Sequence, residues 1–217
     1  SRRSWRSGCD GMISGLAALR ELREGNRRFV DDRRRDDGNT AARLRALAQH
    51  QEPFAIILGC SDARVPAEII FDQGLGDLFV IRVAGNVVAP SQVGSVEFAA
   101  EAFGTRLVVV LGHTSCGAIH ATLQQLARPW REQSRNLKSI VDRIRPAVAG
   151  LLDGTPRDPG ALEHEAVRAN IRMSADHLRH GSEVLEDLIR GQGLLVVGAE
   201  YSLETGVVDF FDGLPPD

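Results

Sequence analysis

The chain has 217 residues, of which 43% are hydrophobic and 25% are charged, and its formal net charge at pH 7 is -3. These values are typical of one soluble globular domain, and they exclude a disordered or fibrous chain. The near balance of charge gives no reason to expect a nucleic-acid partner, and no apolar run is long enough to cross a membrane. The three cysteines, an odd number, argue for reduced thiols rather than a disulfide framework. We therefore expect a cytoplasmic protein with one domain at residues 14–217, preceded by a tail or processing remnant at residues 1–13.

The first part of the domain predicts two helices. Apolar residues recur at helical spacing between Ser14 and Val30, among arginines and glutamates, which indicates an amphipathic helix. A second helix is expected at residues 40–50, with Thr40 as its N-cap. Leu44 and Leu47 are expected on its buried face.

Apolar strands then alternate with helices. Four runs predict strands covered on both faces, at residues 54–59, 77–82, 106–112 and 194–199. Helices are predicted at residues 66–71, 94–103, 116–126, 137–148 and 163–190, with a loop at residues 152–160. This order predicts an α/β fold, in which a mostly parallel central sheet is flanked by helices. Residues 201–211, with a turn at 204–206, predict a closing hairpin and hence a C-terminal antiparallel edge strand.

Residues that bind metals follow two of these strands. Cys60 and Asp62 follow the first strand, and His113 and Cys116 follow the third. The carboxyl ends of strands in an open α/β sheet meet in one ligand-binding crevice. Two thiolates and an imidazole suit zinc, which in catalytic sites keeps a fourth position open. Cys116 also opens a predicted helix, whose N-terminal dipole favours a thiolate.

Arg64 lies two residues beyond Asp62, a spacing that allows a bidentate ion pair. Such a pair would keep the aspartate ionised and off the metal, where it can accept a hydrogen bond from a zinc-bound hydroxide. The alternative is a salt bridge that only braces the loop. His120, one helical turn beyond Cys116, is interpreted as a capping or packing residue rather than a ligand.

These residues carry a family resemblance. The sequences CSDAR, beginning at Cys60, and HTSC, beginning at His113, resemble the C-x-D-x-R and H-x-x-C motifs of the β-class carbonic anhydrases. The resemblance implies that Cys60, His113 and Cys116 bind Zn²⁺ and that Asp62 and Arg64 form the catalytic dyad. It covers most of the chain before the late helices.

The resemblance also implies the reaction and the assembly. A zinc-bound hydroxide would add to carbon dioxide, giving bicarbonate and a proton, which makes the protein a lyase. The smallest active unit would be a homodimer, often assembled further into tetramers, with the site at the subunit boundary. The N-terminal helices would then pack on the partner subunit.

A substrate pocket is implied by the same resemblance. Gln51 matches a substrate-orienting glutamine, and Phe79 matches an aromatic residue that lines the pocket. Phe98 stands where plant-like members carry a pocket tyrosine, so a phenolic hydroxyl is missing from that wall. Gly117, next to Cys116, is also assigned to the substrate pocket.

Some members of the family close their site when the aspartate moves onto zinc, a change favoured by bicarbonate bound to a Trp, an Arg and a Tyr. Arg82 and Tyr201 match the last two, but Ile57 replaces the Trp. We therefore expect no bicarbonate-linked switch, and we expect Asp62 to be a fourth ligand only in a closed, resting state.

Three other functions were weighed. The nearest is hydrolysis of carbonyl sulfide or carbon disulfide on the same fold and zinc, although the sequence around both motifs favours carbon dioxide. Another is a zinc-binding module without turnover, against which the intact dyad argues. A nucleotide-binding protein is weakly supported, because the glycines at 191 and 193 precede a strand instead of following one.

Overall fold

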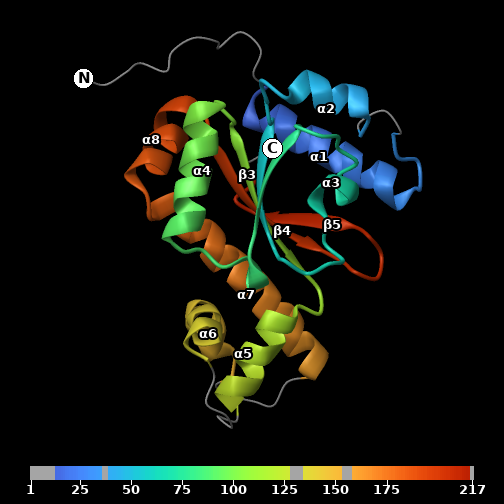
Figure 1. The fold of residues 1–217 in the computed structure, drawn as a ribbon. Helices are drawn as coiled ribbons and strands as arrows, with labels where there is room; N and C mark the ends of the chain where they lie inside the picture. The colour runs from blue at the N-terminus through green and yellow to red at the C-terminus, as the bar shows by residue number, and fades with distance from the viewer. Residues whose placement is uncertain (1–12, 36–38, 128–133, 153–157, 216–217) are drawn as a thin grey trace.

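The computed structural model describes residues 13–35, 39–127, 134–152 and 158–215. Within them the chain forms a central sheet with helices on both sides (Figure 1). Cys9 and nearly all of the expected N-terminal tail lie outside the described residues.

The sheet has five strands in the order β2-β1-β3-β4-β5. Strands β1 to β4 pair in parallel, and β5 pairs antiparallel with β4 at one edge. The mostly parallel sheet and the C-terminal antiparallel edge strand are thus confirmed. The bounds are β1 Ala55–Gly59, β2 Leu78–Arg82, β3 Leu107–His113, β4 Leu195–Tyr201 and β5 Val208–Asp212.

Two central strands are wholly buried, as their unbroken apolar runs predicted. Every residue of β1 and β3 is buried, but in β2 only Leu78 is. The prediction that all four runs are covered on both faces is therefore wrong for β2. The reason is its place in the sheet: β2 is an edge strand that pairs with only one neighbouring strand, so its side chains are less buried.

The described helices are α1 Gly15–Val30, α2 Ala41–Leu47, α3 Ala67–Ile70, α4 Pro90–Ala102, α5 Gly117–Ala127, α6 Arg135–Val148, α7 Pro159–His180 and α8 Glu183–Gln192, with short 3-10 turns η1 Ala84–Asn86 and η2 Ala149–Leu151. None of these helices is both long and apolar enough to cross a bilayer.

The late helical region differs from its prediction. A single helix was expected at residues 163–190, but the chain breaks between α7 and α8. Gly181 ends α7, and the Ser182 hydroxyl accepts a hydrogen bond from the backbone N–H of Leu185 at 3.2 Å, capping α8. A Gly-Ser pair followed by Glu is a helix stop and start signal that the periodicity alone hides. The expected loop at 152–160 is also shorter, because α7 already begins at Pro159, and its residues 153–157 lie outside the described part of the chain.

The sheet separates two hydrophobic cores. Successive residues of a strand face opposite sides, so that Ile56 belongs to one core and Ile57 to the other. Helices α1 and α3 cover the face that holds Ile57, and α4, α7 and α8 cover the face that holds Ile56 (Figure 1). Helices α5 and α6 pack on α7 beyond the carboxyl end of the sheet.

The two N-terminal helices behave differently. Helix α1 buries Leu19 and Leu22 against its own sheet, as its amphipathic pattern predicted. In α2, Thr40 caps the helix as expected, but no residue is buried and Leu44 is 59% exposed, so the predicted buried face is wrong within one chain. The helix is held instead by polar contacts of Arg43, including a hydrogen bond from its Nε to the carbonyl oxygen of Leu75 at 2.8 Å. Packing of α2 on a partner subunit stays a prediction.

Candidate metal centre

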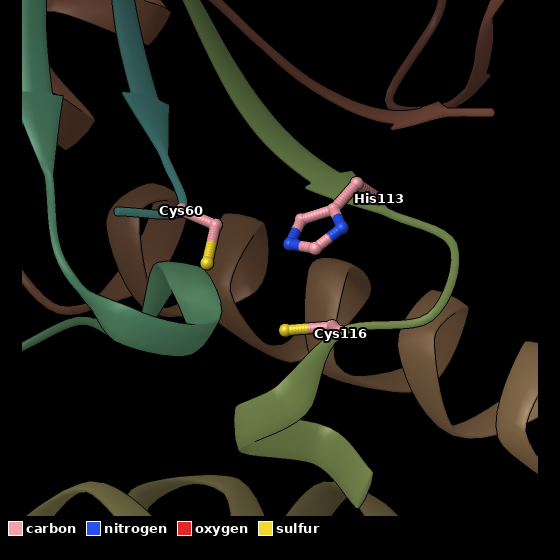
Figure 2. Close-up of side chains that lie close together, drawn as sticks. All are labelled: Cys60, His113 and Cys116. Atoms are coloured by element: carbon pink, nitrogen blue, oxygen red, sulfur yellow. The ribbon is translucent and has the colours of Figure 1, made fainter. Parts of the chain in front are cut away.

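Three metal-binding side chains meet at the carboxyl edge of the sheet. Cys60 follows β1, His113 ends β3, and Cys116 immediately precedes α5. The parallel pairing of β1 with β3 brings the two strand ends together. Both sulfurs and a ring nitrogen of His113 lie within 4.8 Å of one another, and all three residues are buried. Figure 2 shows the three side chains pointing into one common space. The predicted convergence of the two motifs is thus confirmed.

The HTSC loop is built to aim its ligands. Ser115 has a φ of 55°, a left-handed conformation that turns the chain sharply between β3 and α5. The backbone N–H of Thr114 donates to the carbonyl oxygen of Tyr201 at 3.0 Å, and the hydroxyl of Thr114 accepts from the N–H of Leu203 at the same distance. These bonds tie the loop to the strand beside it.

The histidine is oriented as a metal ligand. Its Nδ1 lies 2.9 Å from the carbonyl oxygen of Thr114, to which only a protonated Nδ1 can donate, so in the neutral ring Nε2 carries the free lone pair. Nε2 is buried and has no hydrogen-bond partner among the described residues. A buried polar atom without a partner is costly, but a metal ion would satisfy it. The two cysteines and this nitrogen are also the donors that zinc prefers, so the residues present fit a zinc ion.

The two cysteine thiols have pKa values shifted in opposite directions. A hydrogen bond from Cys116 lowers the pKa of Cys60, and the backbone N–H of Gly85, 3.4 Å from the Cys60 sulfur, adds to this effect. The same bond between the thiols, together with burial, raises the pKa of Cys116. Burial opposes protonation of His113, but its nearness to Cys60 outweighs this and raises the pKa of the ring. Deprotonation is thus favoured at Cys60 over Cys116, and metal binding, which needs both thiolates, would displace protons.

The predicted pair of Asp62 and Arg64 is confirmed. Arg64 donates from Nε to Oδ1 of Asp62 at 2.9 Å and from Nη2 to Oδ2 at 2.8 Å, and its backbone N–H also donates to Oδ1 at 3.0 Å. These bonds hold the pKa of Asp62 well below its usual range, so the carboxylate is ionised at neutral pH. Oδ2 lies 3.9 Å from Nε2 of His113. The carboxylate therefore lies beside the ligand cluster without joining it.

Arg82 braces the loop that carries the dyad. Its Nε donates to the carbonyl oxygen of Cys60 at 3.0 Å, and its Nη2 donates to that of Asp62 at 2.6 Å. Sequence reasoning connected Arg82 only with a bicarbonate site and missed this contact. Arg82 lies at the end of β2 and pairs in register with Gly59, but sheet order is needed to see it.

The residues assigned to the substrate pocket are only partly brought together. Phe79 on β2 and Phe98 on α4 have ring centroids 6.2 Å apart, and both contact the ring of Phe103. Gly117 is exposed at the start of α5, beside the metal centre. Gln51, however, is exposed at the opposite end of β1, and the five-residue strand alone separates it from Cys60 by roughly 17 Å. Within one chain Gln51 does not reach the centre.

Two residues near the centre, His120 and Gly85, have contacts that the sequence did not predict. His120 lies outside the ligand cluster, as expected. Its side chain is 57% exposed, with Nδ1 3.7 Å from Glu163, so the predicted capping or packing role is wrong. Gly85, whose N–H contacts the Cys60 sulfur, was not singled out, although the Gly-Asn pair after β2 is a turn signal that pointed to it.

A Cys-His-Cys cluster beside an ionised aspartate, at the carboxyl edge of a mostly parallel sheet, defines an α/β metalloprotein of the zinc type. Residues 55–208 match the family model described as carbonic anhydrase. The chain is 38% identical over 192 residues to carbonic anhydrase 2 of Mycobacterium tuberculosis, covering 88% of this chain and 90% of that protein. It is 32% identical over 213 residues to a carbonic anhydrase of Pseudomonas aeruginosa, covering 90% and 88%.

Solved structures agree with the sequence comparisons. The β-carbonic anhydrase CcaA superposes with a TM-score of 0.69 at 25% identity, over 92% of this chain and 91% of that one. A β-carbonic anhydrase of Aspergillus fumigatus, CafA, shares the fold with a TM-score of 0.70 at 24% identity, over 93% and 92%. The chain belongs to the β-class carbonic anhydrase family, whose members are zinc enzymes.

Proposed function

We propose that this carbonic anhydrase hydrates carbon dioxide reversibly to bicarbonate and a proton at a zinc ion held by Cys60, His113 and Cys116. The observation that carries the proposal is the buried cluster with the unpartnered Nε2 of His113, next to an ionised Asp62. Three protein ligands leave a fourth position open on a tetrahedral ion, as catalysis requires. When bound, zinc supplies a Lewis acid that lowers the pKa of a coordinated water toward ~7.

Asp62 is proposed to orient the attacking group. Arg64 bonds to both oxygens of the carboxylate, but Oδ2 accepts only one of these three hydrogen bonds and faces the metal centre. An ionised carboxylate can only accept hydrogen bonds. Oδ2 would therefore accept a hydrogen bond from the attacking water or hydroxide, whose oxygen lone pair would then be turned toward the substrate carbon. Asp62 becomes a fourth ligand only where the bonds from Arg64 are broken.

The bicarbonate-linked closure of some family members is proposed to be absent. Ile57 is fully buried in the sheet core, and its apolar side chain offers no indole N–H to bicarbonate. Arg82 is already engaged with the carbonyl oxygens of Cys60 and Asp62. A switch at this position would have to break those bonds.

The pocket is proposed to be completed by a second subunit. The rings of Phe79 and Phe98 suit an apolar substrate, but Phe79 pairs in register with Ile56, four residues before Cys60, so these rings would also have to come from the partner subunit. Gly117 leaves open space beside the centre. A substrate-orienting Gln51 would have to come from the partner subunit, because it lies at the far end of its own strand. We therefore propose a homodimer or a higher homo-oligomer. Support comes from the exposed Leu44 of α2, which offers apolar surface to a partner.

We propose that residues 14–217 form the catalytic domain and that the protein acts in the cytoplasm, where the unpaired thiols of Cys60 and Cys116 stay reduced. No membrane or nucleic-acid partner is proposed.

The substrate is tested by assaying carbon dioxide, carbonyl sulfide and carbon disulfide on one zinc-loaded preparation. The proposal expects turnover of carbon dioxide to exceed that of both sulfur substrates. A preparation that contains zinc but hydrates no carbon dioxide at alkaline pH would overturn it in favour of a non-catalytic zinc module.

A further inference from the structure

A strained turn lies directly behind the metal centre. In η1, Gly85 has a φ of 69° and the next residue, Asn86, has a φ of 43°. Left-handed conformations are uncommon for residues with a side chain, and asparagine is one of the few that adopt them. Here the asparagine is also buried, with 2% of its surface exposed. Such a turn persists only where its surroundings hold it in place, and strain of this kind gathers at functional sites.

The turn presents one backbone group to a metal ligand. The N–H of Gly85 donates to the sulfur of Cys60 at 3.4 Å. The position leaves no room for a side chain, since a Cβ on Gly85 would lie 2.9 Å from Cδ1 of Ile144 and 3.0 Å from Cβ of Ala118. The left-handed glycine is therefore needed for the N–H to approach the sulfur.

A buried side chain on α7 holds the other end of the same residue. Asn170, 2% exposed, donates from Nδ2 to the carbonyl oxygen of Gly85 at 2.8 Å. Its neighbour Ile171 is fully buried and packs over Gly112 of β3, where a Cβ would lie 2.5 Å from Cδ1 of the isoleucine. Helix α7 is thus fixed against the sheet beside the centre, and Asn170 is fixed with it.

We propose that Asn170 is a positioning residue of the metal centre. It pins the carbonyl side of Gly85, so that the N–H side of that residue stays aimed at the sulfur of Cys60. The inference rests on the proposed function, in which Cys60 binds zinc. Groups that hydrogen-bond to metal ligands affect metal affinity by about 10- to 100-fold. Asn170 acts one residue further away, so about 10-fold is expected.

The experiment compares Asn170→Ala and Asn170→Asp with the wild type. Asn170→Asp nearly keeps the shape of the side chain but replaces the amide donor with an acceptor facing the carbonyl oxygen of Gly85. Ser174→Ala is the matched control, since Ser174 is also buried on α7, one turn further along, and makes no hydrogen bond to the turn within the described part of the chain. Two properties are measured: the rate at which a chromogenic chelator takes up zinc, and the thiolate-to-cobalt absorption band of the Co²⁺-loaded protein.

Both Asn170 variants should lose zinc about 10-fold faster than the wild type and should shift the cobalt band, whereas Ser174→Ala should do neither. If Asn170 has only a structural role, its substitution would lower the free energy of unfolding without shifting the cobalt band. Unchanged zinc loss and an unchanged band would overturn the inference. If Asn170→Ala does not fold, Asn170→Ser takes its place under the same two outcomes.

A Cys60→Ser variant separates the two proposals. If that variant loses zinc while the Asn170 variants match the wild type, only the inference fails. If it holds zinc as tightly as the wild type, the proposed ligand set fails, whatever the Asn170 variants do.

Discussion

The two halves of the metal centre are held in different ways. The half with His113 and Cys116 is a short loop, tied to the adjacent strand through Thr114. The half with Cys60 depends on groups that lie more than twenty residues further along the chain, the side chain of Arg82 and the N–H of Gly85. Both halves therefore depend on the assembled fold, since Thr114 bonds to residues 201 and 203. The difference is that the first half is held by neutral groups of the loop itself, and the second by the charged side chain of Arg82.

The largest effect is expected from removing a ligand on either side of the centre. Cys60→Ser and Cys116→Ser should each lose zinc and reduce carbon dioxide hydration to near the background rate, because a neutral hydroxyl is a poor zinc ligand. Zinc content per chain and stopped-flow hydration measure this. Cys9→Ser, which removes a thiol outside the described residues, is the control and should keep both. A Cys60→Ser protein with full zinc content and full activity would show that Cys60 is not required for zinc binding or for hydration.

The next effect separates ligation from catalysis. Asp62→Asn should keep zinc and lose about 10²- to 10⁴-fold in hydration rate, since the amide can donate as well as accept and no longer orders a proton at Oδ2. In the wild type, the low pKa of Asp62 keeps it ionised above pH 5, so the rise of activity toward alkaline pH should not follow its titration. Full activity in the zinc-loaded variant would reduce the pair with Arg64 to a brace of the loop.

A third comparison places one variant in each half. Arg82→Ala removes two hydrogen bonds from a charged group to the Cys60 loop and should lower the free energy of unfolding by about 2 to 3 kcal/mol, with loss of activity. Thr114→Val removes the hydroxyl that accepts from Leu203 and should cost about 1 kcal/mol. Chemical denaturation measures both. Equal losses of stability and activity would contradict the view that the charged contacts of Arg82 hold the Cys60 half more strongly than the neutral contacts of Thr114 hold the other half.

The smallest effect is a pH dependence beside the HTSC loop. Burial raises the pKa of Tyr201 above its ordinary value near 10. The unfolded chain therefore loses this proton first, and the stability that the buried neutral tyrosine contributes is lost as pH rises above about 10. Tyr201→Phe keeps the backbone bond to Thr114 and should show a shallower decline in the free energy of unfolding above that pH. Parallel curves for the two proteins would argue against this origin of alkaline instability.

Much of the fold could be read from the sequence because its strands are continuous apolar runs that differ plainly from the amphipathic helices. The predictions are wrong where the tertiary packing of a segment differs from what its local sequence pattern indicates. Helix α2 carries Leu44 and Leu47 at the spacing of a buried face, but Leu44 is exposed and Leu47 is only half-buried beside Gly76, which the sequence pattern alone does not reveal. The break at Gly181 was masked by apolar residues that keep helical spacing on both sides.

The site was predictable to the same degree. Cys60, His113 and Cys116 could be joined because parallel strands end at one edge, and Asp62 could be joined to Arg64 because they are two residues apart. The contacts of Arg82 and Asn170 could not be foreseen, since they depend on sheet order and on the docking of α7. Gln51 shows a further limit, because its assigned role requires a second copy of the chain.

The most direct test of the account is stopped-flow hydration of carbon dioxide before zinc removal, after chelation, and after zinc is added back. The account predicts that activity falls with the metal and returns as zinc approaches one ion per chain. Activity that persists in the metal-free protein, or zinc that returns without restoring it, would contradict the claim that Cys60, His113 and Cys116 hold the catalytic ion.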